Sequence, residues 1–443
     1  MSWRPPQGPT GPSALAYGRA GVPSVQPAIV LPVAELFIVA VALVFSSNLL
    51  EVFLRSGEGG GIVRLLYLMI YAAAGYLALR AGALGLLVIR AWAILVLILL
   101  PCLSFAWSVL PAETIERMIG VVGTTIVGLF LGWHFRCREI VILLAWALLL
   151  NMVLSIAVIV AVPQIGIAQS GPWQGTWVGI HFHKNGLGAA AQLSFLVMVY
   201  ATVISGGLNR KLFAGGMALS LLLLVGSKST TALLIAMAGF STFLMVFAFQ
   251  HATKLAIMLV CAGLVVTPMI GLMIWQFDLI ALVLNFFGKD FNLSSRVPLW
   301  SLLWPFVEDR FWLGYGYGAF WQLDLPWIDL IEARLNFVPF YSHNGVMELL
   351  LNGGVILLAA FAWVYLTTFA RAIVFSLSKA SRPEMGFPLV FLIIFLLGNV
   401  TEATILSRND LFWTLFVAFS ALLLKEVSLK LGDRQGAPVA IAR

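Results

Sequence analysis

A histidine stands where a long polar stretch of the sequence gives way to an apolar run. His343 lies in Tyr341-Ser342-His343-Asn344-Gly345, and the run that follows predicts a helix capped by Asn344 or Ser342. Because the positive end of a helix disfavours imidazolium, a neutral His343 could accept a proton as a general base. Glu348, one turn further on, could orient His343 or bind substrate. The alternative is a histidine that only caps the helix or lies at an interface.

Two further segments each carry a cation beside hydroxyl groups. Lys228 lies between Ser227 and Ser229 before a predicted helix, whose free backbone N–H groups and dipole favour a phosphate. The alternative is a capped helix start without a ligand. The leading glycine spacing of a Walker A motif is absent. Arg296, in Ser294-Ser295-Arg296, suits a bidentate contact with phosphate.

A third segment, His181-Phe182-His183-Lys184-Asn185, holds two histidines without a carboxylate close by. His181 and His183 would not share one face of a helix, so we expect no metal site. Lys184 is the better candidate, as a further contact for an anion, with His183 and Asn185 beside it. The alternative for the lysines is that their ammonium groups only reach toward lipid headgroups. We expect no cofactor.

The elements that must position these residues are membrane spans. Hydrophobic residues make up 61% of the 443 residues and charged residues only 10%, whereas about a quarter of a soluble domain is charged. Mean hydropathy is +1.01. The net charge of +7 is typical of cationic cytoplasmic loops rather than of nucleic-acid binding. The cysteines, Cys102, Cys137 and Cys261, predict neither a disulfide framework nor a cysteine-based metal site.

Apolar runs of about twenty residues, the length that crosses a bilayer, predict an all-α polytopic fold. We place twelve spans at about residues 33–53, 62–80, 87–107, 115–134, 139–162, 187–205, 211–227, 230–250, 254–275, 345–373, 387–402 and 409–425. Spans one to nine fill residues 33–275, and spans ten to twelve fill residues 345–425. Residues 1–32, rich in Pro, Gly and Ser, predict a disordered cytoplasmic tail, and residues 426–443 a second tail. Residues 276–344 form a large polar loop.

Lysine and arginine set the orientation of the spans. Most cations fall on the side of both tails, which places the tails in the cytoplasm and the large loop outside, in the periplasm of a Gram-negative cell. The short outer turns hold only Arg55, Arg64, Arg117 and Arg408. Against this trend, six further cations sit on the outer side: Lys184, Lys228, Lys289, Arg296, Arg310 and Arg334. Ionisable groups at membrane depth are costly and mark functional cavities. We therefore expect an outward-facing site that contains Lys184, Lys228 and Arg296.

Several motifs occur together and in order. A Gly314-Tyr315-Gly316 turn follows Arg296 in the large loop, and Ser342-His343-Asn344-Gly345 leads into Leu349-Leu350-Leu351-Asn352-Gly353-Gly354. With the many spans and the large outer loop, this set resembles the O-antigen ligase and Wzy polymerase superfamily of bacterial membrane glycosyltransferases. The resemblance covers about residues 170–360. The His183-Lys184-Asn185 triplet is closer to the exopolysaccharide polymerase branch, which acts on succinoglycan-type polymers.

The resemblance implies a GT-C-like bundle, a glycan on undecaprenyl diphosphate as donor, a second glycan as acceptor, and an inverting, metal-independent transfer. His343 matches the family histidine proposed as base or as the residue that orients the acceptor, and Arg296 matches a loop arginine that contacts diphosphate. Lys228 stands where the family commonly has arginine; lysine keeps the charge but loses the bidentate fork. Aromatic side chains of the loop would stack on sugar rings, with Trp300, Tyr315, Tyr317 and Trp321 as candidates.

We therefore expect a polymerase that joins lipid-linked repeat units into exopolysaccharide in the bacterial inner membrane, with its active site facing the periplasm. Its partners would be membrane lipids, a flippase and chain-length or export proteins, without nucleic acid. One alternative is an O-antigen ligase that transfers glycan to lipid A-core, since the sequence does not reveal the acceptor. Another is a transporter of the same lipid-linked glycans. Clustering of charges at the outer surface rather than at the midplane disfavours a transporter.

Overall fold

The computed structural model describes residues 30–47, 60–80, 91–251, 296–335, 339–378 and 382–434. Outside the described residues lie most of the predicted N-terminal tail, the ninth span at about 254–275, the first part of the large loop with Lys289, and the end of the second tail. The described part is helical, apart from one isolated bridge between Ile167 and Trp177.

Eight described helices are long and apolar enough to cross a membrane. They are α3 (Gly60–Arg80), α6 (Pro111–His134), α7 (Cys137–Ala161), α9 (Lys184–Ile204), α10 (Gly207–Ser227), α11 (Thr230–His251), α16 (Gly345–Ser376) and α18 (Leu411–Arg434). The shorter apolar helices are α1 (Val30–Phe45), α5 (Trp92–Leu103) and α17 (Phe387–Gly398). Each coincides with a predicted span, so the prediction of an all-α polytopic membrane protein is confirmed.

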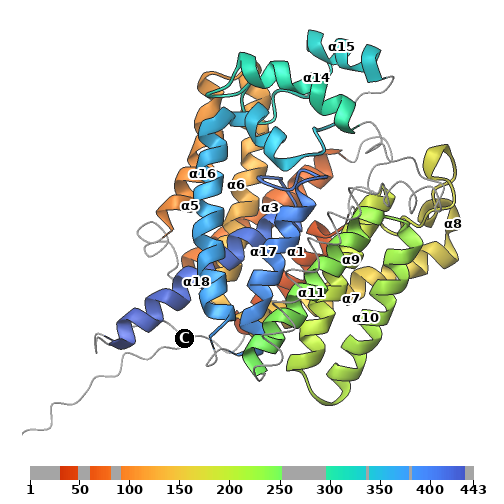
Figure 1. The fold of residues 1–443 in the computed structure, drawn as a ribbon, viewed down its shortest axis with the longest axis vertical. Coiled ribbons are helices and arrows are strands. Elements are labelled where there is room, and N and C mark those ends of the chain that lie inside the picture. Colours follow the sequence, from red (N-terminus) through yellow and green to blue (C-terminus); the bar gives the residue numbers. More distant parts are fainter. Residues whose placement is uncertain are drawn as a thin grey trace, which may run out of the picture.

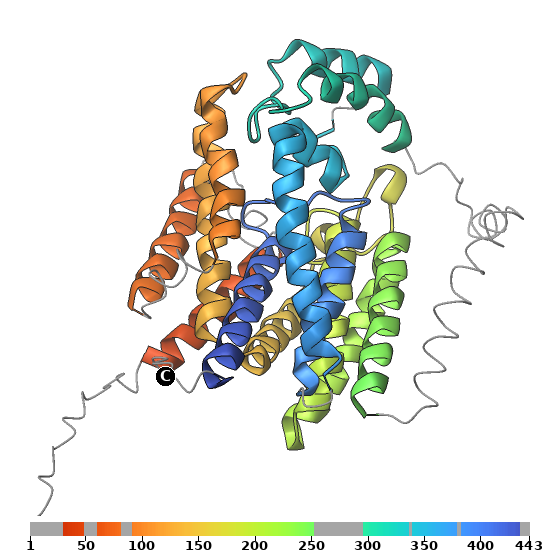
Figure 2. The ribbon, with the colours of Figure 1, turned by 60° about the vertical axis from the view of Figure 1, so that its left-hand side comes forward.

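Two helices of the large loop, α14 (Arg296–Asp309) and α15 (Pro326–Leu335), lie across one end of the bundle (Figure 1, Figure 2). We call this the loop end; α16 begins here. Short helices complete the chain: η1 (Ser104–Ala106), α8 (Pro163–Gly166), η2 (Gly171–Trp173) and η3 (Pro383–Gly386).

Close packing holds the helices that flank residues 399–410. A Cβ at Gly132 of α6 would overlap the backbone of Ala418 of α18, so only glycine permits this approach. Small residues at such contacts let helix backbones come close in a membrane. Phe395 of α17 stacks on Phe416 of α18 with ring centroids 5.2 Å apart. The turn that connects α17 to α18 is therefore anchored at both ends by closely packed helices.

Basic side chains at the opposite end of the bundle bind free carbonyl groups where helices end. Arg138 Nη2 donates to Ile204 O at the end of α9, at 2.8 Å. Lys425 Nζ donates to Trp133 O and Phe135 O at the end of α6, also at 2.8 Å. The last carbonyls of a helix carry partial negative charge, so these cations stabilise the helix ends. Both cations belong to the side predicted to face the cytoplasm.

Helix α16 is broken at Gly353-Gly354, where the backbone is not helical. The large loop fills the break: Tyr315 N–H donates to Leu351 O at 2.7 Å, and Val355 N–H donates to Phe311 O at 2.8 Å. Backbone groups freed by the break therefore have partners. The two glycine-rich motifs of the sequence form one joint, which sets the direction of the first turns of α16.

Candidate active site

Residues 399–410 connect α17 to α18 at the loop end, and Asn399 holds their start in place. The buried Asn399 side chain accepts the backbone N–H groups of Thr404 and Ile405 through Oδ1. Its backbone O accepts the N–H of Gly345, the first residue of α16, at 2.8 Å. Buried amides that are fully bonded fix local geometry. This turn and the start of α16 are therefore coupled.

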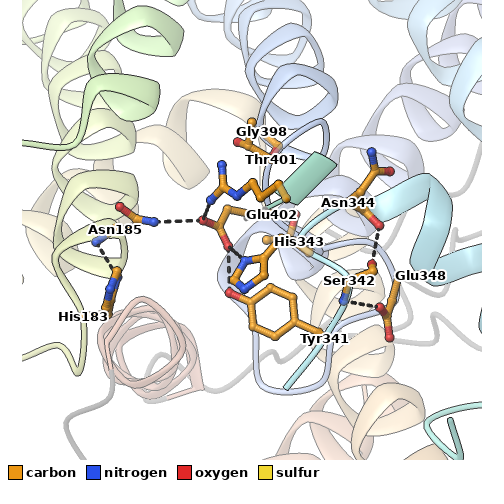
Figure 3. Close-up of polar contacts among 12 residues, drawn as sticks. His183, Asn185, Tyr341, Ser342, His343, Asn344, Glu348, Gly398, Thr401 and Glu402 are labelled. Carbon is orange, nitrogen blue, oxygen red and sulfur yellow. Dashed lines mark hydrogen bonds and ion pairs between the residues drawn. The ribbon is translucent and has the colours of Figure 1, made fainter. Parts of the chain in front are cut away.

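Glu402 in this turn is the centre of a polar cluster (Figure 3). Its Oε1 accepts from Arg296 Nη2 at 3.0 Å and from Asn185 Nδ2 at 3.2 Å. Its Oε2 accepts from the Tyr341 hydroxyl at 2.7 Å and lies 3.5 Å from His343 Nδ1. These partners come from the start of α14, the start of α9 and the segment before α16. Segments distant in sequence thus meet at one carboxylate, which we call the Glu402 cluster.

His343 occupies strained backbone beside Glu402. Its φ is +51°, a left-handed value that residues other than glycine seldom adopt. Its ring lies against that of Tyr341, with centroids 4.2 Å apart. Nδ1 is buried and forms no hydrogen bond with any described residue; it faces the Glu402 carboxylate at a distance too long for a formed bond. Since 29% of the side chain is exposed, the ring is open on another side.

Asn344 is the N-cap of α16. Its Oδ1 accepts the N–H groups of the second and third helical residues, at 2.9 and 3.1 Å. Ser342 instead donates its hydroxyl to Asn344 O at 2.8 Å. The Glu348 carboxylate contacts the backbone of the same segment, because its Oε2 accepts the Ser342 N–H at 3.0 Å. Of the two roles predicted for Glu348, the geometry fits orientation: the carboxylate fixes the backbone that carries His343 (Figure 3).

The start of α9 joins the cluster to the turn between α10 and α11. His183 is the N-cap of α9, and its Nδ1 accepts the Asn185 N–H at 3.2 Å. Asn185 Oδ1 accepts from Ser229 Oγ at 3.4 Å while Asn185 Nδ2 donates to Glu402. Ser229 N–H donates to Ser227 Oγ at 3.2 Å. The predicted phosphate-binding turn is thus tied to Glu402 through Asn185.

The two predicted anion-binding lysines lie at helix ends beside this network. Lys184 is the first residue of α9 and is half-buried. Lys228 is the C-cap of α10, with φ +51°. Its side chain is exposed, and it forms no ion pair within the part of the chain that the structure describes. The ammonium group of Lys228 is therefore open to a ligand.

The charges of the cluster follow from burial and from its contacts. Burial raises the pKa of the Glu402 carboxyl, but His343, Tyr341 and Arg296 outweigh this effect, so the net pKa lies below its ordinary value. Burial and the Glu402 charge raise the pKa of Tyr341. Burial chiefly lowers the pKa of His183. At neutral pH the cluster therefore holds a carboxylate, a tyrosine hydroxyl, a neutral His183 and a guanidinium.

Two of the four aromatic candidates for sugar stacking lie inside the protein. Tyr315 is 3% and Tyr317 7% exposed, and their hydroxyl groups donate to Asp309 and to the backbone O of Leu406. The break in α16 draws this turn inward, so in this conformation neither ring has a face free for a sugar. The other two are half-buried, and their indole N–H groups are bonded: Trp300 to Ser342 O and Trp321 to the Glu348 carboxylate.

His181, in the same loop as His183, is a buried packing residue. Its Nε2 lies 3.3 Å from Asn151 Oδ1, and burial lowers its pKa to about 4. Among the described residues, no three His, Cys, Asp or Glu side chains are arranged as ligands of a metal ion.

The stretch that contains Lys228, Arg296 and His343 has a recognisable family pattern. Residues 215–362, from α10 into α16, match the Wzy_C family model, described as O-antigen ligase. The match in this stretch supports a relationship to the O-antigen ligase and Wzy polymerase superfamily. The described helices make the chain a multi-pass membrane protein. The family match supports glycosyltransferase activity of the ligase or polymerase type and implies lipid-linked glycans as substrates. No curated protein matches the chain.

The stretch that matches the O-antigen ligase family model does not contain Glu402 or Asn185. Asn185 was among the predicted site residues, but Glu402 and Tyr341 were not. The predicted eleventh span ends at residue 402, whereas α17 ends at Gly398, so the prediction assigned Glu402 to a membrane span. The usable signal is a lone carboxylate between two apolar runs, since such a group requires partners at that depth.

Proposed function

We propose that the chain polymerises oligosaccharide repeat units carried on undecaprenyl diphosphate into exopolysaccharide. The observation that carries the proposal is the meeting of Arg296 and His343 at one carboxylate. A guanidinium suited to diphosphate and a ring nitrogen suited to a proton stand side by side there. The match of residues 215–362 to the O-antigen ligase family model supports lipid-linked glycans as substrates.

The reaction is an inverting displacement. The oxygen of an acceptor hydroxyl forms a bond with the anomeric carbon of the donor glycan while the bond from that carbon to the diphosphate breaks. The bonding electron pair leaves with undecaprenyl diphosphate, and the hydroxyl proton passes to His343. Arg296, Lys228 and Lys184 stabilise the negative charge that develops on the leaving diphosphate, which requires no metal ion. Trp300 and Trp321 are the remaining candidates to contact sugar rings.

The site faces the periplasm from the inner membrane. Support comes from the opposite end of the bundle, where Arg138 and Lys425 belong to the cationic side that the positive-inside rule assigns to the cytoplasm. The isoprenoid tail of the donor remains in the bilayer between the helices, while its diphosphate reaches the loop end. A flippase supplies the donor at this face, and export proteins receive the product.

Transfer to lipid A-core is the second candidate function, and the description of the matched family as O-antigen ligase favours it. Both functions use the same donor and the same leaving group. They differ only in the acceptor, which is another lipid-linked repeat unit for a polymerase and lipid A-core for a ligase.

The test uses purified full-length protein and undecaprenyl diphosphate-linked oligosaccharides. These oligosaccharides are extracted from cells that lack the protein. We expect longer glycans to form in the presence of EDTA and without nucleotide. His343→Ala and Arg296→Ala should abolish elongation at normal protein levels, and Arg334→Ala, which removes an exposed arginine of α15, should not. Full elongation by both site variants, or no elongation by the wild type, would contradict the proposal. Product that appears only with lipid A-core added would assign the ligase function instead.

A further inference from the structure

The Glu402 carboxylate has two sides, and each side faces a different part of the proposed chemistry. Oε1 holds Arg296 and Asn185, while Oε2 holds the Tyr341 hydroxyl and faces His343 Nδ1. Only 26% of the Glu402 side chain is exposed, so its charge depends on these partners. Glu402 therefore connects Arg296, which is proposed to bind the leaving diphosphate, to His343, which is proposed to take the acceptor proton.

Two anions compete for Arg296 when a donor binds. Glu402 neutralises the guanidinium in an ion pair of 3.0 Å. A diphosphate carries more negative charge than a carboxylate and matches the guanidinium fork equally well. As the donor engages Arg296, Glu402 loses its strongest positive partner. The carboxylate then interacts more strongly with the next nearby donor of positive charge, which is His343.

We propose that Glu402 is the positioning residue that couples donor binding to proton removal: it holds His343 through Nδ1, and occupation of Arg296 by the diphosphate strengthens its pull on the His343 proton. This inference rests on the proposed function. It extends the reaction by one step, in which Nε2 takes the acceptor proton and Nδ1–H is shared with Glu402. A carboxylate at one ring nitrogen sets the tautomer of the other.

The geometry of the ring supports this arrangement. Nδ1 is buried against Glu402, whereas part of the His343 side chain is exposed. Contact with the tilted Tyr341 ring and the φ of +51° hold the ring in this orientation. The contact of 3.5 Å is long for a hydrogen bond, and such catalytic contacts tighten when substrate binds.

The charged and titratable groups around this pair come from four elements. Arg296 approaches from α14, and His183 and Lys184 approach from the start of α9. Tyr341 lies in the segment before α16. The charge of Glu348, in the first turns of α16, contributes to the raised pKa of Tyr341. Among these described groups, Glu402 is the carboxylate that contacts His343.

The test is the pH profile of elongation for Glu402→Gln and Tyr341→Phe, which should change the attraction of residue 402 for the His343 proton in opposite directions. Glu402→Gln keeps the shape but removes the charge, so imidazolium loses its counter-ion and the acid limb of kcat should move to lower pH. We expect kcat at neutral pH to fall by about 100-fold, and the donor KM to stay level or decrease because Arg296 loses a competitor. Glu402→Asp should keep the position of the acid limb and restore part of kcat.

Tyr341→Phe removes the hydrogen bond to Oε2 and leaves the charge, so Glu402 attracts the His343 proton more strongly and the acid limb should move to higher pH. Glu332→Gln, an exposed glutamate of α15, is the matched control and should behave as wild type. If Glu402 were purely structural, its replacement would lower protein yield, and the acid limb would stay in place in both Glu402→Gln and Tyr341→Phe. If the wild type is active, that outcome contradicts the proposed coupling of donor binding to proton removal but not the proposed function. An inactive wild type would instead contradict the proposed function.

Discussion

Lys228 and His343 share an uncommon backbone conformation. Each has φ +51°, although neither is a glycine. Such residues carry strain of about 1–3 kcal/mol that the surrounding structure must offset, and they gather at functional sites. At Lys228 the strain has a visible result, because the ammonium group is exposed while Ser227 and Ser229 on either side are buried.

Lys228→Gly separates the charge of this residue from its backbone. Glycine adopts positive φ without strain, so the temperature of unfolding should stay level or rise. Loss of the ammonium group should raise the donor KM about tenfold, which corresponds to about 1.4 kcal/mol for one charge-assisted contact with phosphate. Steady-state kinetics and thermal unfolding of the same preparation measure both effects. Lys211→Ala removes a charge at the opposite end of α10 and should change neither; an unaltered KM in Lys228→Gly would refute the phosphate contact.

At the scale of elements, the break in α16 decides where His343 and Glu348 lie. The first turns of α16 begin at the Asn344 cap and end at Gly353-Gly354, where the large loop inserts its backbone. Because the turns before the break bond both to this loop and to Asn399, they can be oriented independently of the longer part of the helix. The site is thus carried by a short segment held at both ends.

Gly354→Ala tests this joint. Gly354 has φ +63°, and an added Cβ would overlap the backbone of Trp312. We expect a loss of stability of at least about 2 kcal/mol and a fall in kcat, because the turns that position His343 must shift. Gly215→Ala in α10 is the control: it is exposed, nothing lies within 4 Å of the added Cβ, and alanine favours a helix. Equal stability and activity of the two variants would show that the break does not position the site.

The parts of this arrangement that depend on local sequence could be predicted. Apolar length predicts each described span, and the spacing of Asn344 and His343 before an apolar run predicts a capped helix start with the histidine beside it. Glu402 could not be assigned in this way, because its role depends on α9, α14 and α16 packing around one turn. The burial of Tyr315 and Tyr317 could not be predicted for a related reason. Aromatic residues in a polar stretch fit a sugar-binding surface and a small buried cluster equally well.

At the scale of the whole molecule, the bundle separates two kinds of cation. At the end opposite the loop, Arg138 and Lys425 bind the last carbonyls of helices. At the loop end, Arg296 pairs with a carboxylate and the Lys228 side chain is exposed. The first group stabilises helices and sets topology, and the second is available for an anionic ligand. The proposed reaction requires that the second group face outward.

Cysteine labelling in intact cells tests this orientation. The native residues Cys102, Cys137 and Cys261 are first replaced by alanine, and a single cysteine is then introduced at an exposed position at either end. Glu332→Cys in α15 should react with a membrane-impermeant maleimide once the outer membrane is permeabilised, because it lies at the loop end. Lys211→Cys, at the start of α10, should react only after the inner membrane is opened. The reverse pattern would place the Glu402 cluster in the cytoplasm, where a donor delivered to the periplasm could not reach Arg296.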